Sequence, residues 1–253
     1  MKRYTIKEIS VGFVMFLILW TGLALIVNKS ILPSPLSVLP LFLKLMAGEL
    51  GIHFLVSTLR VITAILAALI TAVPAGLVLG QMKALNRFFS PLISVLYAIP
   101  KIVLLPVIYV LFGISDFSKI LLISLILFFQ ILVVVRDESV GLPGTLINSV
   151  RSLGAGRLAL FRFVYFPASI PAILTAVRVS VGTSLAVLFI AEQSLTEYGL
   201  GYFIIVRAYQ SLRYKEMYAG ILAISLLGFL LYYLIDILEW RVSRHKAETD
   251  GRR

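Results

Sequence analysis

Apolar stretches of about 20 residues recur along this chain, and they constrain its fold more than any other feature. A helix of this length crosses a hydrocarbon core of roughly 30 Å. The sequence predicts six such spans, at residues 9–27, 53–80, 91–113, 119–135, 170–191 and 216–240. We therefore expect an all-α integral membrane protein, with residues 1–253 forming a single transmembrane domain and the core spans lying within 53–240.

The composition supports membrane insertion and argues against most enzyme classes. Hydrophobic residues make up 60% of the chain and charged residues 14%, which is too apolar for a soluble domain of this length. There is no cysteine, and the two histidines, His53 and His245, lie far apart in the sequence. We therefore predict no catalytic residue, no metal site and no cofactor. Residues 9–27 lack a small-residue cleavage site, so we interpret them as a span.

The positive charge of the chain predicts its orientation. A net charge of +11 would suit nucleic acid, but in a membrane protein Lys and Arg concentrate in cytoplasmic loops, and we predict no nucleic-acid partner. With the N-terminus inside, most basic residues fall on the cytoplasmic side. The outer segments then hold Lys29, Lys44, Lys119, Arg207, Arg213 and Lys215. Both termini and the loop at 136–167 are therefore expected in the cytoplasm.

The segments between the spans differ in character. Residues 81–90 read as a short loop, and Pro100 and Pro106 interrupt the third span. Residues 136–167 form a large cytoplasmic loop. The basic tail at 241–253 is expected to be solvated and partly disordered.

The stretch from Asn148 to Pro167 combines basic residues with amphipathic spacing. Arg151, Arg157 and Arg162 keep it out of the bilayer core, while apolar residues between them are available for burial. Gly154 and Gly156 allow a turn with positive φ between two short helices, and Pro167 ends the second helix or starts the next one. The pattern alone favours two alternatives equally: a partner-binding helical turn outside the membrane, or an amphipathic loop on the lipid headgroups.

A family resemblance decides between these two alternatives. Gly154, followed after nine residues by Val164-x-Phe166-Pro167, resembles the Gly-x9-Ile-x-Leu-Pro signature of the membrane subunits of bacterial ABC importers, known as the EAA loop. The resemblance implies a type I ABC importer permease bundle in the bacterial inner membrane. The Glu-Ala-Ala head of the motif is replaced by Asn148-Ser149-Val150, so a salt bridge from that glutamate is not expected here.

In this family the EAA loop forms a coupling helix that sits in a groove of the ATPase subunit. Carried over to this sequence, the resemblance implies ATPase-coupling roles for Asn148, Ser149, Arg151, Leu153, Gly154, Ala155, Arg157, Phe161 and Pro167. It also implies three kinds of protein partner: an ABC ATPase dimer, a second and identical permease subunit, and an extracytoplasmic solute-binding protein.

Further segments resemble the importers of the nitrate, sulfonate and taurine group. These are Leu32-Pro33-Ser34-Pro35, the segment from Ile99 to Pro106, Phe128-Phe129, Ala191-Glu192 and Gly199-Leu200-Gly201. The resemblance covers about 32–240. It implies a small oxyanion as the solute, although related importers carry thiamine-precursor pyrimidines.

Polar residues within the predicted spans are candidates for the translocation path. Charges deep in a bilayer usually face a cavity or a partner. We name Arg60, Lys101, Arg178, Thr183, Ser184 and Glu192 as path candidates. For each of the three basic residues the alternatives are snorkelling to the interface or a structural pair with Glu192 or Asp236, and for the hydroxyl residues the alternative is plain helix packing.

The chain lacks the Gly-x4-Gly-Lys-Ser/Thr phosphate loop, so ATP hydrolysis would fall to a separate subunit. A secondary transporter working without an ATPase is the main alternative. It would show internal repeats and carboxylates at mid-membrane, and we find no convincing repeat and few such carboxylates. A membrane-embedded enzyme and a purely structural subunit are two further alternatives.

Overall fold

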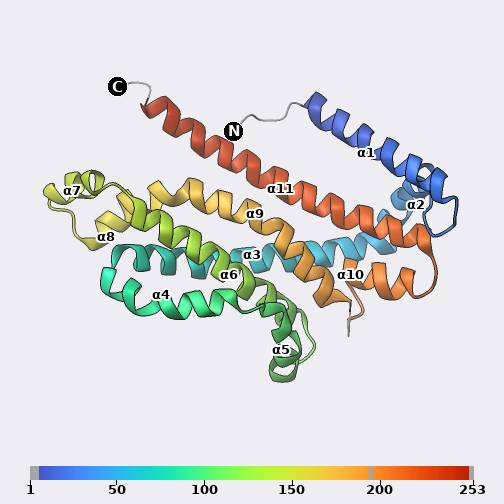
Figure 1. Ribbon diagram of the computed structural model, residues 1–253, viewed down its shortest axis with the longest axis horizontal. Helices are drawn as coiled ribbons and strands as arrows, with labels where there is room; N and C mark the ends of the chain where they lie inside the picture. The colour runs from blue at the N-terminus through green and yellow to red at the C-terminus, as the bar shows by residue number, and fades with distance from the viewer. Residues whose placement is uncertain (1–5, 194–195, 251–253) are drawn as a thin grey trace. The chain divides into compact units, whose positions relative to one another are not determined.

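The computed structural model describes residues 6–193 and 196–250, and these residues form helices joined by short connections, with no strand among them (Figure 1). The chain divides into two compact units. Unit 1 comprises Met1–Ser57 and Glu192–Leu226, and unit 2 comprises Thr58–Ala191 and Leu227–Arg253. The three longest helices are α3 (Glu49–Gln81), α9 (Phe166–Glu192) and α11 (Tyr214–Asp250); α3 and α11 are divided between the units, and α9 belongs to unit 2 except for its last residue, Glu192.

Unit 1 contains α1 (Ile6–Val27), α2 (Pro35–Met46), α10 (Leu200–Tyr202) and the π-helical η3 (Phe203–Tyr209), together with the first turns of α3 and α11. Pro35 occupies the first turn of α2, where its missing N–H costs nothing. The Trp20 indole donates to the carbonyl of Pro33 at 3.1 Å and stacks on Tyr218, with ring centroids 5.7 Å apart. This side chain therefore joins α1 to the connection before α2 and to the start of α11.

Unit 2 is built around α3 and α6 (Asp116–Gly141). Ser115 caps α6, because its side chain accepts a hydrogen bond from the N–H of Ser118 at 3.3 Å. Gly76 and Gly80 lie one turn apart on α3 and face Val135 and Ser139 of α6 so closely that a Cβ at either glycine would collide. Two small residues at this spacing allow helix backbones to approach, so they define the α3–α6 contact.

The remaining helices of unit 2 are shorter. They are α4 (Lys83–Ala98), the 3₁₀ helix η1 (Lys101–Leu104), α5 (Leu105–Phe112), α7 (Gly144–Ser152), α8 (Arg157–Leu160) and the π-helical η2 (Phe161–Tyr165). α8, η2 and α9 follow one another without a break, so the helical path from Arg157 reaches Glu192.

The prediction of about six membrane spans is confirmed in number, with one change of form. Within the described residues, five helices are long and apolar enough to cross a membrane, and a sixth crossing requires α4 and the Lys101–Phe112 segment to be counted together. These two parts are bent by 81° at Ile99 and Pro100. Pro100 lacks an N–H and disfavours helix at the preceding residue, which is why one straight third span does not form.

Helix boundaries differ from the expected limits of the segments between spans in three places. The loop expected at 81–90 is mostly the beginning of α4, since helix starts at Lys83. The tail at 241–253, expected to be solvated and partly disordered, continues α11 as far as Asp250, and residues 251–253 lie outside the described residues. The loop expected at 136–167 starts within α6 and ends within α9. In each case the helix continues past the end of the apolar stretch, because hydropathy marks the lipid-facing part of a helix and not its hydrogen-bonded end.

Candidate functional site

The segment from Gly144 to Pro167 forms the expected helix–turn–helix. α7 ends at Ser152, Gly154 adopts φ +83°, and α8 begins at Arg157. The N–H of Gly154 donates to the carbonyl of Arg151 at 3.0 Å and closes the turn. Gly156, by contrast, has φ −77°, so the prediction of a left-handed turn holds for Gly154 alone. Pro167 lies in the first turn of α9 and ends no helix.

The turn presents apolar side chains to the outside of the chain. Leu153 is 86% exposed and Leu158 is 81% exposed, whereas Leu160, Val164 and Tyr165 are buried. The second helix therefore anchors the segment, and the two exposed leucines flank Gly154. Of the remaining coupling candidates, Asn148, Ser149 and Pro167 are exposed, while Ala155 and Phe161 are half-buried.

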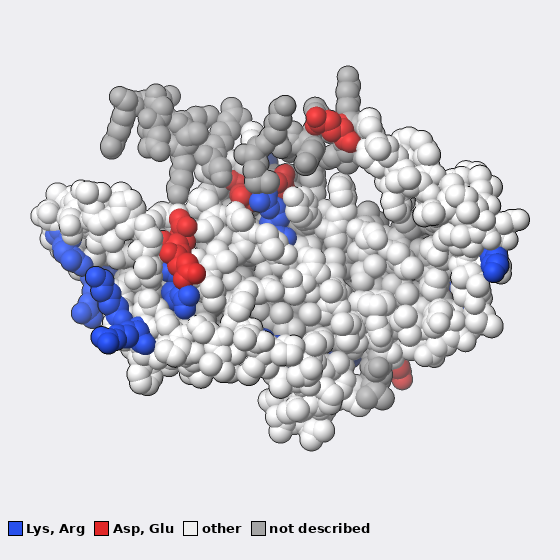
Figure 2. All heavy atoms as spheres, viewed as in Figure 1, with Lys and Arg blue, Asp and Glu red and all other residues white. Residues whose placement is uncertain are grey.

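Basic side chains surround this turn. Arg151, Arg157 and Arg162 are exposed, and none of them forms an ion pair with another described residue. Lys83 and Arg87, at the start of α4, are exposed as well. Figure 2 shows Lys and Arg gathered at the end of unit 2 that holds α7, α8 and the turn between α3 and α4. This surface therefore combines positive charge with exposed leucine.

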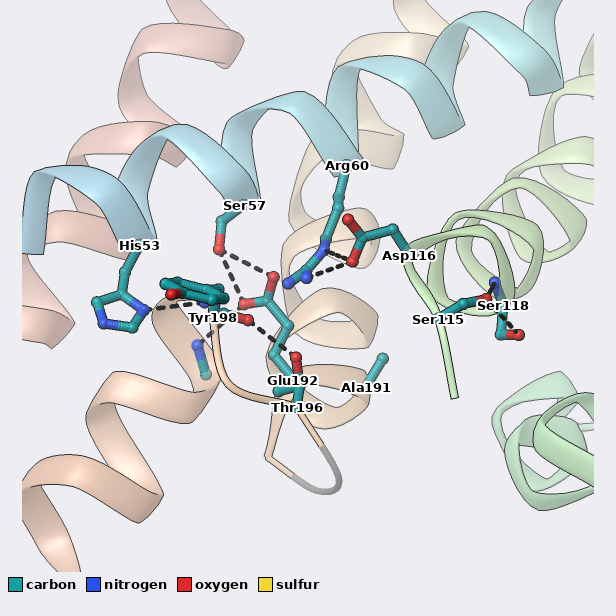
Figure 3. Close-up of polar contacts among 12 residues, drawn as sticks. His53, Ser57, Arg60, Ser115, Asp116, Ser118, Ala191, Glu192, Thr196 and Tyr198 are labelled. Carbon is teal, nitrogen blue, oxygen red and sulfur yellow. Dashed lines mark hydrogen bonds and ion pairs between the residues drawn. The ribbon is translucent and has the colours of Figure 1, made fainter. Parts of the chain in front are cut away.

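A buried polar cluster in unit 1 caps the helix that starts at Leu200 (Figure 3). Three consecutive backbone N–H groups each donate to a side chain: Gly199 to His53 Nδ1 at 3.0 Å, Leu200 to Ser57 Oγ at 2.8 Å, and Gly201 to Glu192 Oε2 at 3.0 Å. Helix N-termini leave such donors unsatisfied, and an acidic group there is also favoured by the helix dipole.

Glu192 is fully buried in this cluster, and Gly199 adopts φ +126° with no room for a Cβ beside the Glu192 carboxylate. The segments Ala191-Glu192 and Gly199-Leu200-Gly201, which stand apart in the sequence, therefore meet at one site. His53 and Ser57 were not predicted. Their signal was available, because two polar residues four apart lie on the same face of an otherwise apolar helix.

An exposed ion pair lies beside this cluster. Arg207 Nε donates to Glu49 Oε1 at 2.9 Å. The hydrogen bond and the charge of Glu49 raise the pKa of Arg207 above its ordinary value. A group whose pKa is raised in the folded state contributes stability that is fully present below its unfolded-state pKa. This stability is lost only as pH rises through the folded-state pKa. Both pKa values of Arg207 lie far above physiological pH, so its contribution does not change there.

Arg60 and Arg178, both path candidates, form ion pairs within unit 2. Arg60 is buried and its Nε donates to Asp116 Oδ1 at 3.0 Å (Figure 3). Arg178 Nη1 lies 3.2 Å from Asp236 Oδ1 and 3.1 Å from Glu239 Oε2. A carboxylate partner offsets part of the free energy that is needed to remove an arginine side chain from water. The structural pair with Asp236, given above as an alternative to a path role, is therefore present for Arg178.

The hydroxyl candidates on α9 lie on the packed side of unit 2. Ser184 is fully buried and donates to the carbonyl of Val181 at 2.7 Å, and Thr183 is half-buried. Ser180, one turn before Ser184, donates to Gln130 Oε1 of α6 at 3.2 Å. These contacts are those of helix packing and of one hydrogen bond between neighbouring helices.

Lys101 lies at the bend between α4 and η1. Its Nζ donates to the carbonyls of Tyr97 and Ile99, each at 3.3 Å, and lies 4.6 Å from the centroid of the Phe129 ring. It borders a cavity of about 290 Å³ that is also lined by Gln130 and Ile126. Of the path candidates, Lys101 is the one that lines this cavity.

The described residues contain no group of three His, Asp or Glu side chains able to hold a metal ion.

Apolar spans, a broken helix beside a cavity and an exposed helical turn together define a membrane-spanning transport subunit. Residues 64–244 match the family described as binding-protein-dependent transport system inner membrane component, and the chain belongs to this family of ABC importer permeases. Such subunits lie in the inner membrane and work with a separate ATPase.

Individual relatives agree with this assignment. The taurine transport system permease protein TauC of Escherichia coli is 29% identical over 257 residues, covering 98% of this chain and 93% of that protein. A putative ABC transporter permease of Methanocaldococcus jannaschii is 33% identical over 85% of this chain and 82% of its own length. The nitrate import permease protein NrtB of Synechocystis is 28% identical over 91% of this chain and 86% of its own length.

The fold is also found in a solved structure. The MetNI methionine ABC transporter, in an inward-facing conformation, matches with a TM-score of 0.65 and 20% identity, covering 74% of this chain and 93% of that one. The expected permease fold is thereby confirmed.

Proposed function

We propose that this chain forms the translocation path of an importer for a small oxyanion such as taurine, another sulfonate or nitrate. The names of the taurine and nitrate relatives support this class of solute. A relative named as a formylaminopyrimidine permease, 28% identical over 94% of this chain, makes that pyrimidine the second solute to test.

We further propose that the segment from Asn148 to Pro167 couples the chain to its ATPase. The exposed Leu153 and Leu158 on either side of the Gly154 turn carry this proposal. Both side chains remain exposed among the described residues, at the tip of a basic segment, and exposed apolar surface of this kind is typical of a protein interface. Arg151 and Arg157 would add charge complementarity at its rim.

The working assembly would contain two copies of this chain, two ATPase subunits on the cytoplasmic side and an extracytoplasmic solute-binding protein. The chain carries no phosphate-binding loop, so hydrolysis would occur in the ATPase. Closure of the ATPase pair would rock the permease bundles through the two coupling turns. The cap at Leu200 would hold the connection that follows α9, and the Arg60 and Arg178 pairs would keep the spans in place.

The coupling proposal is tested by purifying the tagged full-length chain from its native membrane and identifying the chains that come with it. Leu153→Glu combined with Leu158→Glu should reduce the recovered ATPase by about tenfold or more, since burying an unpaired carboxylate costs more than the ~1.4 kcal/mol that a factor of ten requires. Both leucines are exposed, so the substitutions should leave the fold of this chain intact.

Leu43→Glu is the matched control, because Leu43 is 67% exposed and lies on α2 in unit 1. If the double variant retained its ATPase as well as the control did, the coupling role of this turn would be refuted.

Uptake of labelled taurine, nitrate and formylaminopyrimidine into vesicles, with and without ATP, tests the solute. Uptake that ran equally without ATP would favour a secondary transporter.

A further inference from the structure

The bend between α4 and η1 exposes polar backbone within an apolar region. Helix stops at Ala98, and the carbonyls of Tyr97 and Ile99 point to Lys101 Nζ instead of to later N–H groups of a continuing helix. Interrupted helices within membranes are tolerated where the freed backbone is buried in protein or lines a water-filled cavity. The cavity of about 290 Å³ beside this bend meets that condition.

The cavity is small and carries few polar groups on an otherwise apolar wall. Its volume lies near the lower end of the range of about 300–1,000 Å³ seen for ligand pockets, so it suits a small solute. Tyr97, Phe129 and Ile126 supply apolar and aromatic surface, and Lys101 and Gln130 supply nitrogen donors.

The charge of Lys101 is not balanced by an acid. Among the residues whose side chains the structure describes, no carboxylate pairs with it, whereas Arg60 pairs with Asp116 and Arg178 with Asp236 and Glu239. Two carbonyls and the face of Phe129 stabilise the ammonium but leave its net charge in place. A half-buried cation without a counter-charge is costly, and an anionic ligand removes that cost.

Gln130 supplies a second donor at the same cavity. Its Oε1 accepts a hydrogen bond from Ser180 at 3.2 Å, which holds the side-chain amide in place. Its NH₂ group makes no hydrogen bond with any described residue, so two donors remain for a ligand. An ammonium and an amide NH₂ together match the acceptor oxygens of a sulfonate, a carboxylate or nitrate.

We propose that this cavity is the subsite that binds the anionic group of the transported solute, with Lys101 as its counter-charge and Gln130 as its second donor. The proposal rests on the oxyanion importer function proposed above. A role for Lys101 as a mere cap of α4 explains its carbonyl contacts but not its place beside a cavity with a second donor. The two roles differ in whether the cavity attracts anions.

The charge near the cavity can be measured without a transport assay, from the reactivity of one introduced thiol. This is possible because the chain has no cysteine of its own. Ile126→Cys introduces one thiol at the cavity wall of the full-length protein in lipid nanodiscs. Its rates of reaction with a sulfonate-bearing and a trimethylammonium-bearing methanethiosulfonate are followed by the mass of the chain. The same measurement is made with Lys101→Met added, and with Lys83→Met as a control that removes an equal charge from the exposed start of α4.

We expect the ratio of the anionic to the cationic rate to fall about five- to tenfold on Lys101→Met, and to stay the same on Lys83→Met, because a unit charge acts strongly within about 4 Å and weakly beyond a Debye length. Added nitrate or ethanesulfonate should slow the anionic reaction in the protein that retains Lys101. A ratio that Lys101→Met leaves within about twofold, or a thiol unreactive to both reagents, would overturn the proposal.

ATP-dependent uptake by the complex purified from native membranes separates this proposal from the broader function. Lys101→Met should lower taurine or nitrate uptake about tenfold or more, and Lys101→Arg should retain most of it, because arginine keeps the charge. If the rate ratio shifts but the native complex imports no oxyanion, the anion subsite stands and the solute assignment fails. If import is normal in Lys101→Met, the subsite fails and the importer function stands.

Discussion

The Ser57 hydroxyl donates to both carboxylate oxygens of Glu192, at 3.0 and 2.8 Å, although 135 residues separate them in the chain. Ser57 Oγ in turn accepts from the N–H of Leu200 at 2.8 Å. One buried hydroxyl thus links the first part of α3, the end of α9 and the helix that begins at Leu200. Buried networks of this kind are costly when one member is removed.

Glu192→Ala should therefore destabilise the protein. It removes the acceptor of the Gly201 N–H and of the Ser57 hydroxyl, and a buried donor left unsatisfied costs about 1–3 kcal/mol. The melting temperature in detergent should fall by several degrees, at roughly 2–4 °C per kcal/mol for a chain of this size. Glu197→Ala serves as the control, because Glu197 is an exposed acid in the same connection. Equal melting temperatures for both variants would refute the capping role.

Gly199→Ala should destabilise the protein at least as much as Glu192→Ala does, for two reasons that act together. The φ of +126° disfavours any residue with a Cβ, and the Cβ would collide with the Glu192 carboxylate. Backbone strain alone costs about 1–3 kcal/mol. Gly182→Ala, in α9, has no atom within 4 Å of its Cβ and should be neutral or slightly stabilising. The yield of monodisperse protein and its melting temperature report both effects. A Gly199→Ala protein with the yield and melting temperature of the unsubstituted chain would contradict the observed geometry.

Gly80→Ala should loosen the contact between α3 and α6. Its Cβ would collide with the side chain of Ser139 and lie 3.2 Å from the carbonyl of Arg136, and overpacking of this kind costs about 1–3 kcal/mol. Ser139→Gly opens space opposite, so the double variant should be more stable than the sum of the single effects predicts. A double-mutant cycle on melting temperature measures this coupling. Gly12→Ala, with open space around it on α1, is the control, and strictly additive effects would refute the contact.

Arg178→Met tests whether this arginine stabilises the bundle or contacts the solute. Removing it leaves Asp236 and Glu239 without the cation between them, and for this partly buried pair the cost should lie below the roughly 3–5 kcal/mol of breaking a fully buried one. The melting temperature should fall, and adding Asp236→Asn and Glu239→Gln should restore most of it. A role in the path alone would lower uptake of the anion and leave the melting temperature unchanged.

The sequence predicted the parts of this structure that depend on local chemistry. Six apolar stretches predict the membrane crossings, because a chain with this many cannot bury them all in water-soluble form. Gly154 predicts the turn at which α7 ends, since glycine tolerates the left-handed conformation found there. Pro100 marked an interruption of the third span, although the size of the bend, 81°, was not accessible from the sequence.

Pairings over long distances in the chain were beyond sequence reasoning. The partner of Arg60 is Asp116, 56 residues away, and the cap of Leu200 uses His53 and Ser57, whose shared helix face is visible in the sequence although their distant partners are not. Ion pairs and caps depend on which helix faces which, and a single helix carries no information about its neighbour's register.

The sequence by itself therefore determined the class of the protein, its spans and the turn at Gly154, because hydropathy and glycine conformation act within a few residues. Only the tertiary structure decided the roles of the polar residues inside those spans. It paired Arg60 and Arg178 with acids, assigned Glu192 to a helix cap, and left Lys101 beside a cavity without a counter-charge. The physical reason is that the cost of a buried charge is set by the groups around it, and folding alone brings those groups together.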